Sequence, residues 1–173
     1  MRSEAELERT ITLYADTVKR LCWIHLKNHA DTEDIFQTVF LKYVLHPALF
    51  ETPEHEKAWI IRVTINACKD LLKSFFRRQT TSLQDISEQV STTIPEEYSE
   101  LMEAVLKLPE QYRRVIYLHY YEGYTAPQIG GILHKNVNTV YTMLNRARQI
   151  LKQELGGGHS GTAICGSHDT NSG

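Results

Sequence analysis

The residues best suited to contact a nucleic acid lie on one face of a predicted helix near the C-terminal end of the chain. Steps of four, three, four and four residues predict one buried apolar stripe, formed by Val140, Leu144, Ala147, Leu151 and Leu155. The remaining face carries Tyr141, Thr142, Asn145, Arg146, Arg148 and Gln149. Hydroxyl, amide and guanidinium groups are the ones that meet phosphates and base edges. By itself, this pattern fits an ordinary solvated helix face equally well.

A second polar set follows one side of the predicted helix 57–78. Its members are separated by four, three and four residues and are Arg62, Asn66, Lys69 and Lys73. Another side of the same helix can turn inward with Trp59, Val63, Ala67 and Leu71. Cations along one side of a helix can neutralise a few phosphates, so this set is a second candidate for nucleic-acid binding.

The elements that must position these residues are predicted to be helices throughout, which makes the fold class all-α. Residues 124–155 predict a short helix, a four-residue turn and a longer helix. This is the order in which a helix-turn-helix unit presents a recognition helix to the DNA major groove. Upstream, the periodic apolar residues predict helices over 4–28 and over 31–46, the latter capped by Asp31.

Loops and domain boundaries follow from prolines, glycines and charge. Residues 47–56 contain two prolines and are predicted to form a loop, while Pro109 is predicted at the first position of a helix that ends at Gly123. Two small helical domains are expected, joined by a flexible acidic linker and followed by a disordered tail rich in Gly and Ser. Their predicted ranges are 1–78, 79–97 for the linker, 98–155, and 156–173 for the tail.

Charge is distributed in blocks that match this organisation. The net charge is +5 over residues 57–78, −6 over 79–106 and +5 over 107–152, although the whole chain has a net charge of −2. Each basic block contains one of the two candidate nucleic-acid faces. The near-neutral total argues weakly against a nucleic-acid binder that acts alone, because such proteins are usually basic.

Composition excludes several classes of function. No apolar run is long enough for membrane insertion, and the acidic N-terminus is unlike a secretory signal. Three widely spaced cysteines indicate no disulfide framework, and a cytoplasmic, reducing location is expected. No glycine-rich phosphate loop, nucleophile triad or paired-carboxylate site occurs, so we expect a protein that is not an enzyme and needs no cofactor.

Metal binding is also not expected. His25 and His29 are four residues apart, but no third ligand is evident and a surface pair is the simpler interpretation. His159, Cys165 and His168 in the tail could hold a soft metal, which would make the chain a metal-responsive sensor. We keep this as an alternative hypothesis and assign no metal ligand.

Two segments of the chain together resemble a known family. DTEDIFQTVFLKY followed by KAWIIRVTINACKDLLKS resembles region two of bacterial RNA polymerase sigma factors of the extracytoplasmic-function group. LPEQYRRVIYLHYYEGYTAPQIGGILHKNVNTVYTMLNRARQIL resembles region four of the same group. The resemblance covers residues from about 5 to 155 in the expected order. It implies a region-two bundle of three to four helices and a region-four helix-turn-helix.

The resemblance also implies partners and a role for each candidate residue. Region two would dock on the clamp helices of the polymerase large subunit through Asp34, Gln37 and Phe40, and region four would meet the flap. The third helix would contact the opened minus-ten element of the promoter through Arg62, Asn66, Lys69 and Lys73, next to a base pocket in loop 48–56. The recognition helix would read the minus-thirty-five element through Thr139, Tyr141, Thr142, Asn145, Arg146 and Arg148. An anti-sigma factor is a further expected partner.

The recognition unit departs from the family pattern at several positions. Tyr141 and Met143 stand where Lys and Arg are usual, which puts two DNA contacts in doubt. Gln128 stands where Glu is common, and the pair Gly130 and Gly131 costs roughly 1 kcal/mol each relative to Ala inside a helix. Close approach of the two helices would explain Gly130. The main alternative function is a free-standing helix-turn-helix regulator that binds DNA as a dimer.

Overall fold

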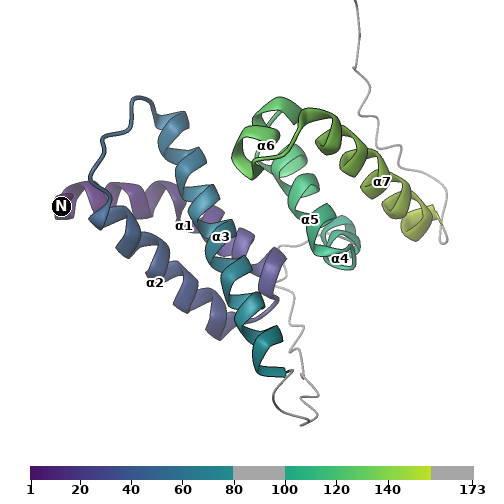
Figure 1. Cartoon of the computed structure of the whole chain (residues 1–173), viewed down its shortest axis with the longest axis horizontal. Helices are drawn as coiled ribbons and strands as arrows, with labels where there is room; N and C mark the ends of the chain where they lie inside the picture. The colour runs from purple at the N-terminus through teal and green to yellow at the C-terminus, as the bar shows by residue number, and fades with distance from the viewer. Residues whose placement is uncertain (80–99, 157–173) are drawn as a thin grey trace, which may run out of the picture.

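The computed structural model describes residues 1–79 and 100–156, and within these ranges every regular element is a helix (Figure 1). The predicted all-α class is therefore confirmed for this part of the chain. The described residues do not include the predicted linker, except for Gln79, or the predicted tail after Gly156. The candidate metal ligands of the tail, His159, Cys165 and His168, are therefore also outside them. None of the described helices is long and apolar enough to cross a lipid bilayer.

The first three helices pack into a bundle around one apolar core. They are α1(Glu4–Leu26), α2(His29–Leu45) and α3(Pro53–Gln79). The core contains Val18, Val39, Tyr43, Ile60 and Cys68, all of which are completely buried. A capping box between Ser3 and Glu6 starts α1, since the Ser3 side chain accepts from the Glu6 backbone N–H while the Glu6 carboxylate accepts from the Ser3 backbone N–H.

Two helix starts differ from the sequence-based prediction. The N-cap of α2 is Asn28, whose side chain accepts a hydrogen bond from the Asp31 backbone N–H, so Asp31 lies inside the first turn as a favourable acid. Helix α3 begins at Pro53, four residues before Lys57, because proline is well tolerated at a first helical position and the Thr52 hydroxyl accepts from the His55 N–H. The loop between α2 and α3 is correspondingly shorter than predicted.

The second group of helices contains the predicted helix-turn-helix. It consists of α4(Glu100–Leu106), α5(Glu110–Ile116), a π-helical turn η1(Tyr117–Tyr121), α6(Ala126–Leu133) and α7(Val137–Gly156). Pro109 caps α5 rather than occupying its first position, and Gly123 ends this segment with a φ of 74° that favours glycine. Three residues, rather than the predicted four, separate α6 from α7.

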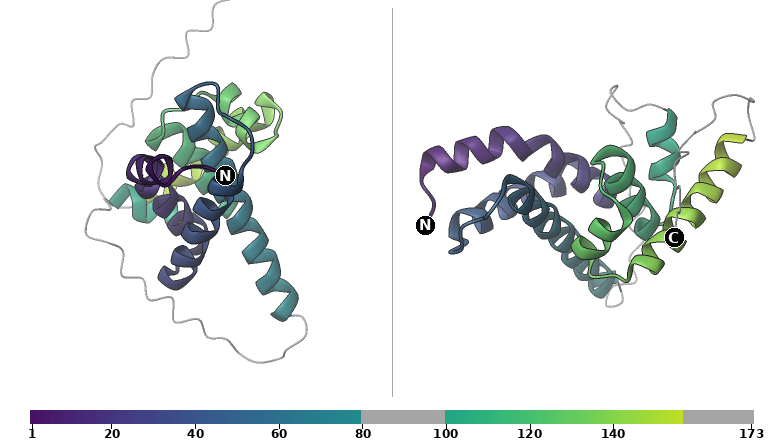
Figure 2. Two further views of the ribbon diagram at one scale, coloured as in Figure 1. Left: turned by 90° about the vertical axis from the view of Figure 1, so that its left-hand side faces the viewer. Right: turned by 90° about the horizontal axis from the view of Figure 1, so that it is seen from above.

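The two groups pack directly against each other, which the sequence did not predict. Helix α1 contacts α5, and α3 contacts α6 (Figure 2). The buried side chains of Leu21, Ile24, Ile61 and Ile65 belong to the same apolar cluster as the core of α4–α7. We call this contact between α1/α3 and α5/η1/α6 the seam.

Candidate nucleic-acid interfaces

Helix α7 has the two faces that its sequence predicts. Val140, Leu144, Ala147 and Leu151 are buried, and Leu155 is partly buried against the same core. The opposite face exposes Thr139, Tyr141, Thr142, Asn145 and Arg146. The helix therefore presents hydroxyl, amide and guanidinium groups along its outer side.

Two positions on α7 depart from a freely exposed polar face. Met143, where the family has an arginine, is only 7% exposed and packs into the core. Arg148 is half-buried. Its Nε donates to the Tyr120 hydroxyl at 2.7 Å, and its Nη1 donates to Asn145 Oδ1 at 3.3 Å. Arg148 is thus held in one orientation by the π-helical turn before any ligand arrives.

An open groove runs beside α7 and reaches the start of α5. Most of the residues that line it are of polar types, and they are Gln111, Tyr112, Lys135, Asn138, Thr139, Thr142, Met143 and Arg146. Five of these side chains come from outside the set predicted from the family pattern: Gln111, Tyr112, Lys135, Asn138 and Met143. Gln111, Tyr112 and Lys135 reach α7 only when α5 and the turn fold against it, so no spacing in the sequence indicates them, whereas Asn138 lies one helical turn before Thr142 and could have been identified from spacing.

A capping box fixes the start of α6, the first helix of the helix-turn-helix. Thr125 and Gln128 form a capping box, with the Thr125 hydroxyl accepting from the Gln128 N–H and the Gln128 Oε1 accepting from the Thr125 N–H. Glutamine thus replaces the glutamate of the family pattern without loss of the motif. His134 ends α6 in the left-handed region with a φ of 54°.

The second candidate face, on α3, is divided by the seam. Asn66 and Lys73 are exposed, whereas Arg62 and Lys69 are half-buried. Arg62 donates from Nε to the Ile132 carbonyl at 3.3 Å and from Nη2 to the Gly131 carbonyl at 3.4 Å. Burial lowers the pKa of Lys69, and the nearby cations Arg114, Lys135 and Lys73 lower it further, with Glu110 opposing them.

The loop between α2 and α3 carries a cluster of aromatic rings. The rings of His46, Phe50 and Trp59 lie 4.6 to 5.5 Å apart between centroids, and none of the three is fully buried. Leu49 beside them is 82% exposed. This partly open cluster offers apolar ring faces of the kind on which an unstacked base can rest.

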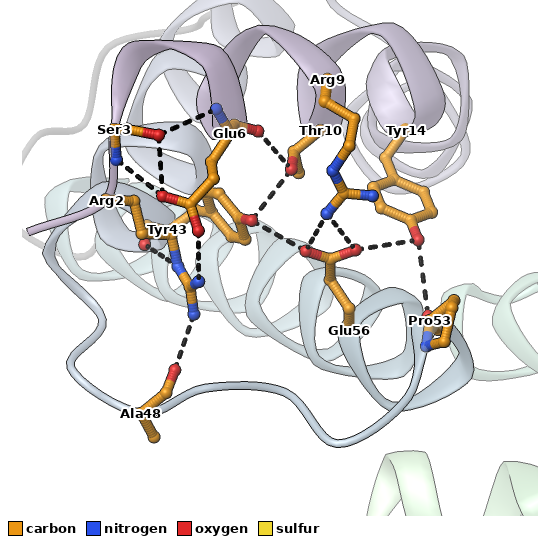
Figure 3. A network of polar contacts seen from close by, with 10 residues as sticks. All are labelled: Arg2, Ser3, Glu6, Arg9, Thr10, Tyr14, Tyr43, Ala48, Pro53 and Glu56. Atoms are coloured by element: carbon orange, nitrogen blue, oxygen red, sulfur yellow. Dashed lines mark hydrogen bonds and ion pairs between the residues drawn. The ribbon is translucent and has the colours of Figure 1, made fainter.

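The N-terminal Arg2 holds this loop in place (Figure 3). It donates from Nε to the Tyr43 carbonyl at 3.2 Å and from Nη2 to the Ala48 carbonyl at 2.6 Å. Its guanidinium lies over the rings of Tyr43 and Phe50 at 4.5 and 4.8 Å from their centroids. Arg2 therefore joins the N-terminus to the last turn of α2 and to the loop that follows it. This role of Arg2 could not be predicted from the sequence, because its partners are 41 to 46 residues away.

A buried carboxylate anchors the start of α3 against α1 and α2 (Figure 3). Glu56 accepts hydrogen bonds from Arg9 at 2.9 and 3.0 Å, from the Tyr43 hydroxyl at 2.8 Å and from the Tyr14 hydroxyl at 3.3 Å. Burial and the adjacent Glu56 raise the pKa of Tyr14 to about 12, so its hydroxyl remains a donor at neutral pH. Because all three helices contribute, Glu56 fixes the geometry of the bundle at the end where the loop begins.

The predicted polymerase-docking residues fall on two different sides of α2. Asp34 and Gln37 are exposed, but Phe40 is 5% exposed and packs against Phe36 in the bundle core. Leu41 and Leu45, which are 60% and 61% exposed, continue the face of Asp34 and Gln37 at helical spacing. These two leucines were not predicted as docking residues, although helical spacing places them opposite the buried residues of α2 and could have identified them.

Metal and thiol chemistry find no support in the described residues. No group of three or more His, Cys, Asp or Glu side chains within 1–79 and 100–156 could hold a metal ion. The interpretation of His25 and His29 as a surface pair was wrong, because His25 is buried on α1 whereas His29 is exposed at the start of α2. Cys22 and Cys68 are buried free thiols with their sulfurs 3.9 Å apart.

Comparison with known proteins gives consistent matches along the chain. The family model described as Sigma-70 region 2 matches residues 10–80, and Sigma-70, region 4 matches residues 98–151. The ECF RNA polymerase sigma factor SigW of Bacillus subtilis (strain 168) is 27% identical over 161 residues, which span 84% of this chain and 86% of SigW. The RNA polymerase sigma factor SigV of the same strain is 26% identical over 156 residues, spanning 88% and 93% of the two chains.

Solved structures share the fold at lower sequence identity. The sigma factor RpoE, in complex with the anti-sigma factor NepR from Bartonella quintana, has a TM-score of 0.70 and 17% identity and covers 87% of this chain and 97% of its own. CnrH, in complex with the cytosolic domain of CnrY, has a TM-score of 0.63 and 18% identity, covering 91% and 92%. Two family models in their natural order therefore account for most of the chain, and the chain belongs to the sigma-70 family of RNA polymerase sigma factors, in its extracytoplasmic-function group.

Proposed function

We propose that this sigma factor binds its promoter at two elements, one with each of its two helical groups. As a sigma factor it directs promoter-specific initiation by RNA polymerase. In the proposal, α2 docks on the polymerase, α3 and the loop before it hold the opened minus-ten element, and α7 reads the minus-thirty-five element. The observation that carries this assignment is the exposed polar face of α7 on a helix-turn-helix that follows a separate basic helix in the same chain.

The docking surface proposed on α2 combines polar and apolar groups. Asp34 and Gln37 supply a carboxylate and an amide that fix orientation, and Leu41 and Leu45 supply apolar area that water now covers. Phe40, assigned to this surface by family resemblance, would act from beneath by supporting α2, since its own ring is buried.

The minus-ten surface proposed on α3 must offset the unstacking of bases, which costs a few kcal/mol per extruded base. Cations along the single strand and ring faces for the bases are the usual means. Lys73 and Asn66 are exposed for the first purpose, and the rings of His46, Phe50 and Trp59 suit the second. Arg62 and Lys69 would join them once the second helical group moves away.

The minus-thirty-five surface proposed on α7 is Thr139, Tyr141, Thr142, Asn145, Arg146 and Arg148. Tyr141 in place of the usual lysine exchanges a charge for a ring with a hydroxyl, and Met143 contributes to the core instead of to DNA. Fewer cations predict weaker phosphate binding and a greater share for base contacts.

Run-off transcription with core polymerase tests this proposal. Asp34→Ala and Leu41→Ala should each reduce initiation at least about tenfold, which corresponds to a loss of about 1.4 kcal/mol in docking. Asp16→Ala and Leu13→Ala are matched controls on α1, where both side chains are also exposed, and should leave initiation unchanged. Undiminished product from both α2 variants would overturn the docking assignment.

A free-standing regulator would behave differently in a direct binding experiment. The near-neutral charge of the chain predicts poor binding of the free protein to duplex DNA at physiological salt. Tight and promoter-specific binding that core polymerase does not improve would favour the dimeric regulator instead.

We also infer that an anti-sigma factor holds this chain inactive, in the cytoplasm, until a signal releases it. The support is the structural neighbour RpoE, which was solved in complex with the anti-sigma factor NepR. The candidate partner should abolish run-off transcription when added to the purified chain, and its removal should restore it. A candidate that binds without affecting initiation would not be that partner.

A further inference from the structure

Three side chains, Tyr120, Arg148 and Asn145, tie the recognition helix α7 to the π-helical turn η1. We propose that Tyr120 is a positioning residue for promoter recognition: through Arg148 it holds the Asn145 amide so that Asn145 presents hydrogen-bond donors to the DNA. The base that Asn145 contacts is then one with acceptors in the major groove, guanine before the others. The role given to Tyr120 rests on the proposed recognition of the minus-thirty-five element by α7.

Arg148 is the centre of this chain of contacts. Its Nε donates to the Tyr120 hydroxyl at 2.7 Å, and its Nη1 donates to Asn145 Oδ1 at 3.3 Å. The first is a short bond from a charged donor, which is stronger than a bond between neutral groups. The guanidinium carbon also lies 5.7 Å from the centroid of the Tyr120 ring. Because both bonds come from one planar group, a guanidinium that Tyr120 holds in place also determines where the Asn145 oxygen lies.

Tyr120 is in turn held by the structure of η1. The His119 ring packs edge-on against the Tyr120 ring with 4.8 Å between the centroids, and His119 Nδ1 lies 2.8 Å from the Tyr124 carbonyl oxygen. Because η1 is π-helical, its wider turn displaces its side chains around the axis relative to an α-helical continuation of α5. The position of the Tyr120 hydroxyl is therefore determined outside α7, and it is present in the protein without a ligand.

The contact with Arg148 determines which end of the Asn145 amide remains for a base. An asparagine side chain has an acceptor oxygen and an NH₂ group with two donors, whereas arginine has donors alone. The atom that faces Arg148 must therefore be Oδ1. The guanidinium occupies one lone pair of Oδ1 and places a positive charge beside the other, so a second donor at Oδ1 would have to approach a cation. The Nδ2 donors are then the groups with which Asn145 contacts DNA.

The donor and acceptor pattern of the bases converts this orientation into a base preference. Asparagine ordinarily pairs with adenine, because its amide accepts from the N6 amino group and donates to N7. Guanine presents two acceptors in the major groove, N7 and O6, while cytosine presents a donor. An asparagine whose oxygen is engaged by Arg148 loses the contact to adenine N6 but keeps its donors for guanine. Asn145 therefore favours guanine over adenine, the reverse of the usual preference of asparagine.

The places of Asn145 and Arg148 along α7 fit these different roles. A recognition helix contacts base edges with its N-terminal residues. Asn145 is exposed and lies one helical turn after the exposed Tyr141, whereas Arg148 is half-buried and lies three residues further from the start of the helix. Arg148 is thus less well placed for a base edge than for supporting Asn145. Its Nη2 takes no part in the two bonds and remains for a backbone phosphate.

Run-off transcription by the full chain and core polymerase, from promoters randomised in the minus-thirty-five element, tests the base preference. Sequencing of the products gives the ratio of guanine to adenine at each position. Asn145→Ala should abolish the preference at one position, which identifies the base that Asn145 contacts. At this position the wild type should favour guanine over adenine at least about fivefold, as expected for one good base contact. Gln153→Ala is the matched control, since it removes an exposed amide further along the same helix and should change no ratio.

Tyr120→Phe tests the positioning role, because it keeps the ring but removes the hydroxyl that accepts from Arg148. The ratio of guanine to adenine at the Asn145 position should fall at least about twofold, while the other positions keep their ratios. Arg148→Leu should lower the same ratio, and the double variant should lower it no further, because both changes act through one contact. Tyr121→Phe, at a neighbouring tyrosine of similar exposure, is the control and should leave the ratio unchanged.

Three results would overturn the proposal: a smaller guanine preference in the wild type, no position at which Asn145→Ala abolishes a preference, or an unchanged ratio in Tyr120→Phe. A loss of product in Tyr120→Phe that is equal for every promoter would also overturn it, because a purely structural role changes the yield and not the ratio. Failure of the proposed function is distinguishable, because no substitution on α7 would then change the preference at any position of the minus-thirty-five element.

Discussion

At the scale of single residues, two side chains that sequence periodicity does not single out determine the geometry of the first bundle. Glu56 joins α3 to both α1 and α2, and Arg2 joins the N-terminus to the loop after α2. Both act on partners more than ten residues away in the chain. Helical periodicity reports which side of a helix is buried, but it contains no information about which buried polar groups meet across helices.

We expect Glu56→Ala to lower the free energy of unfolding by about 2–4 kcal/mol. The substitution leaves the buried hydroxyls of Tyr14 and Tyr43 and the Arg9 guanidinium without their acceptor. Urea unfolding at pH 7 measures the change. Glu54→Ala, an exposed acid two residues earlier, is the control and should stay within about 0.5 kcal/mol of wild type. Equal stability of the two variants would contradict the assignment of Glu56 as the anchor.

Arg2→Ala should loosen the loop between α2 and α3 without unfolding the bundle. Loss of the bonds to the Tyr43 and Ala48 carbonyls removes two constraints, and about tenfold faster amide hydrogen exchange in residues 47–52 would correspond to about 1.4 kcal/mol. Arg2→Lys should recover only part of the protection, since lysine lacks the planar fork that lies over two rings. Unchanged hydrogen exchange in Arg2→Ala would show that Arg2 does not restrain the loop.

At the scale of elements, most of the fold could be predicted, and the misses have identifiable causes. The prediction of the buried stripe of α7 was correct because five apolar residues repeat at helical spacing. The predicted start of α2 was wrong because Asn28 and Asp31 are both good N-cap residues, and the sequence alone does not distinguish them. Phe40 shows the limit for the site: its aromatic type fits docking and core packing equally, and only the neighbouring helices decide that it is buried.

The adjacent glycines of α6 should respond oppositely to alanine. A Cβ on Gly130 would lie 2.7 Å from the Lys135 carbonyl oxygen, so the close approach is to the turn backbone and Gly130→Ala should destabilise the protein by about 1–3 kcal/mol. A Cβ on Gly131 meets nothing within 4 Å, so Gly131→Ala should stabilise it by about 1 kcal/mol. Urea unfolding of the two full-length variants measures both changes. Stabilisation by Gly130→Ala would refute the contact.

At the scale of the whole molecule, the packing of the two helical groups was not predictable from the sequence. Periodicity marks Leu21 and Ile61 as buried but does not say that a distant group of helices covers them. At the same seam the two basic blocks can lie close together, since Glu110 and Glu122 lie among the cations of α3 and α5. The described part of the molecule therefore has one resting arrangement, in which the two helical groups are packed together.

Acid should weaken this resting arrangement through His25. Burial and the facing cations Arg114, Arg113 and Lys69 together lower the pKa of His25 from its usual 6.5 to about 3, against the Leu21 carbonyl that raises it. A lowered pKa means that the folded state favours neutral imidazole, so the stabilisation is complete above pH 6.5 and is lost as the pH falls toward 3. Between pH 7 and pH 5 the loss amounts to about 2 kcal/mol.

The change is measured as the free energy of unfolding at pH 7 and pH 5 in wild type and in His25→Gln, whose amide oxygen can still accept from Arg114 but does not titrate. Carboxylates titrate alike in both proteins, so the difference between the two pH dependences isolates His25. His29→Gln removes an exposed histidine and should behave as wild type. An identical pH dependence in wild type and His25→Gln would show that the imidazole does not hold the seam.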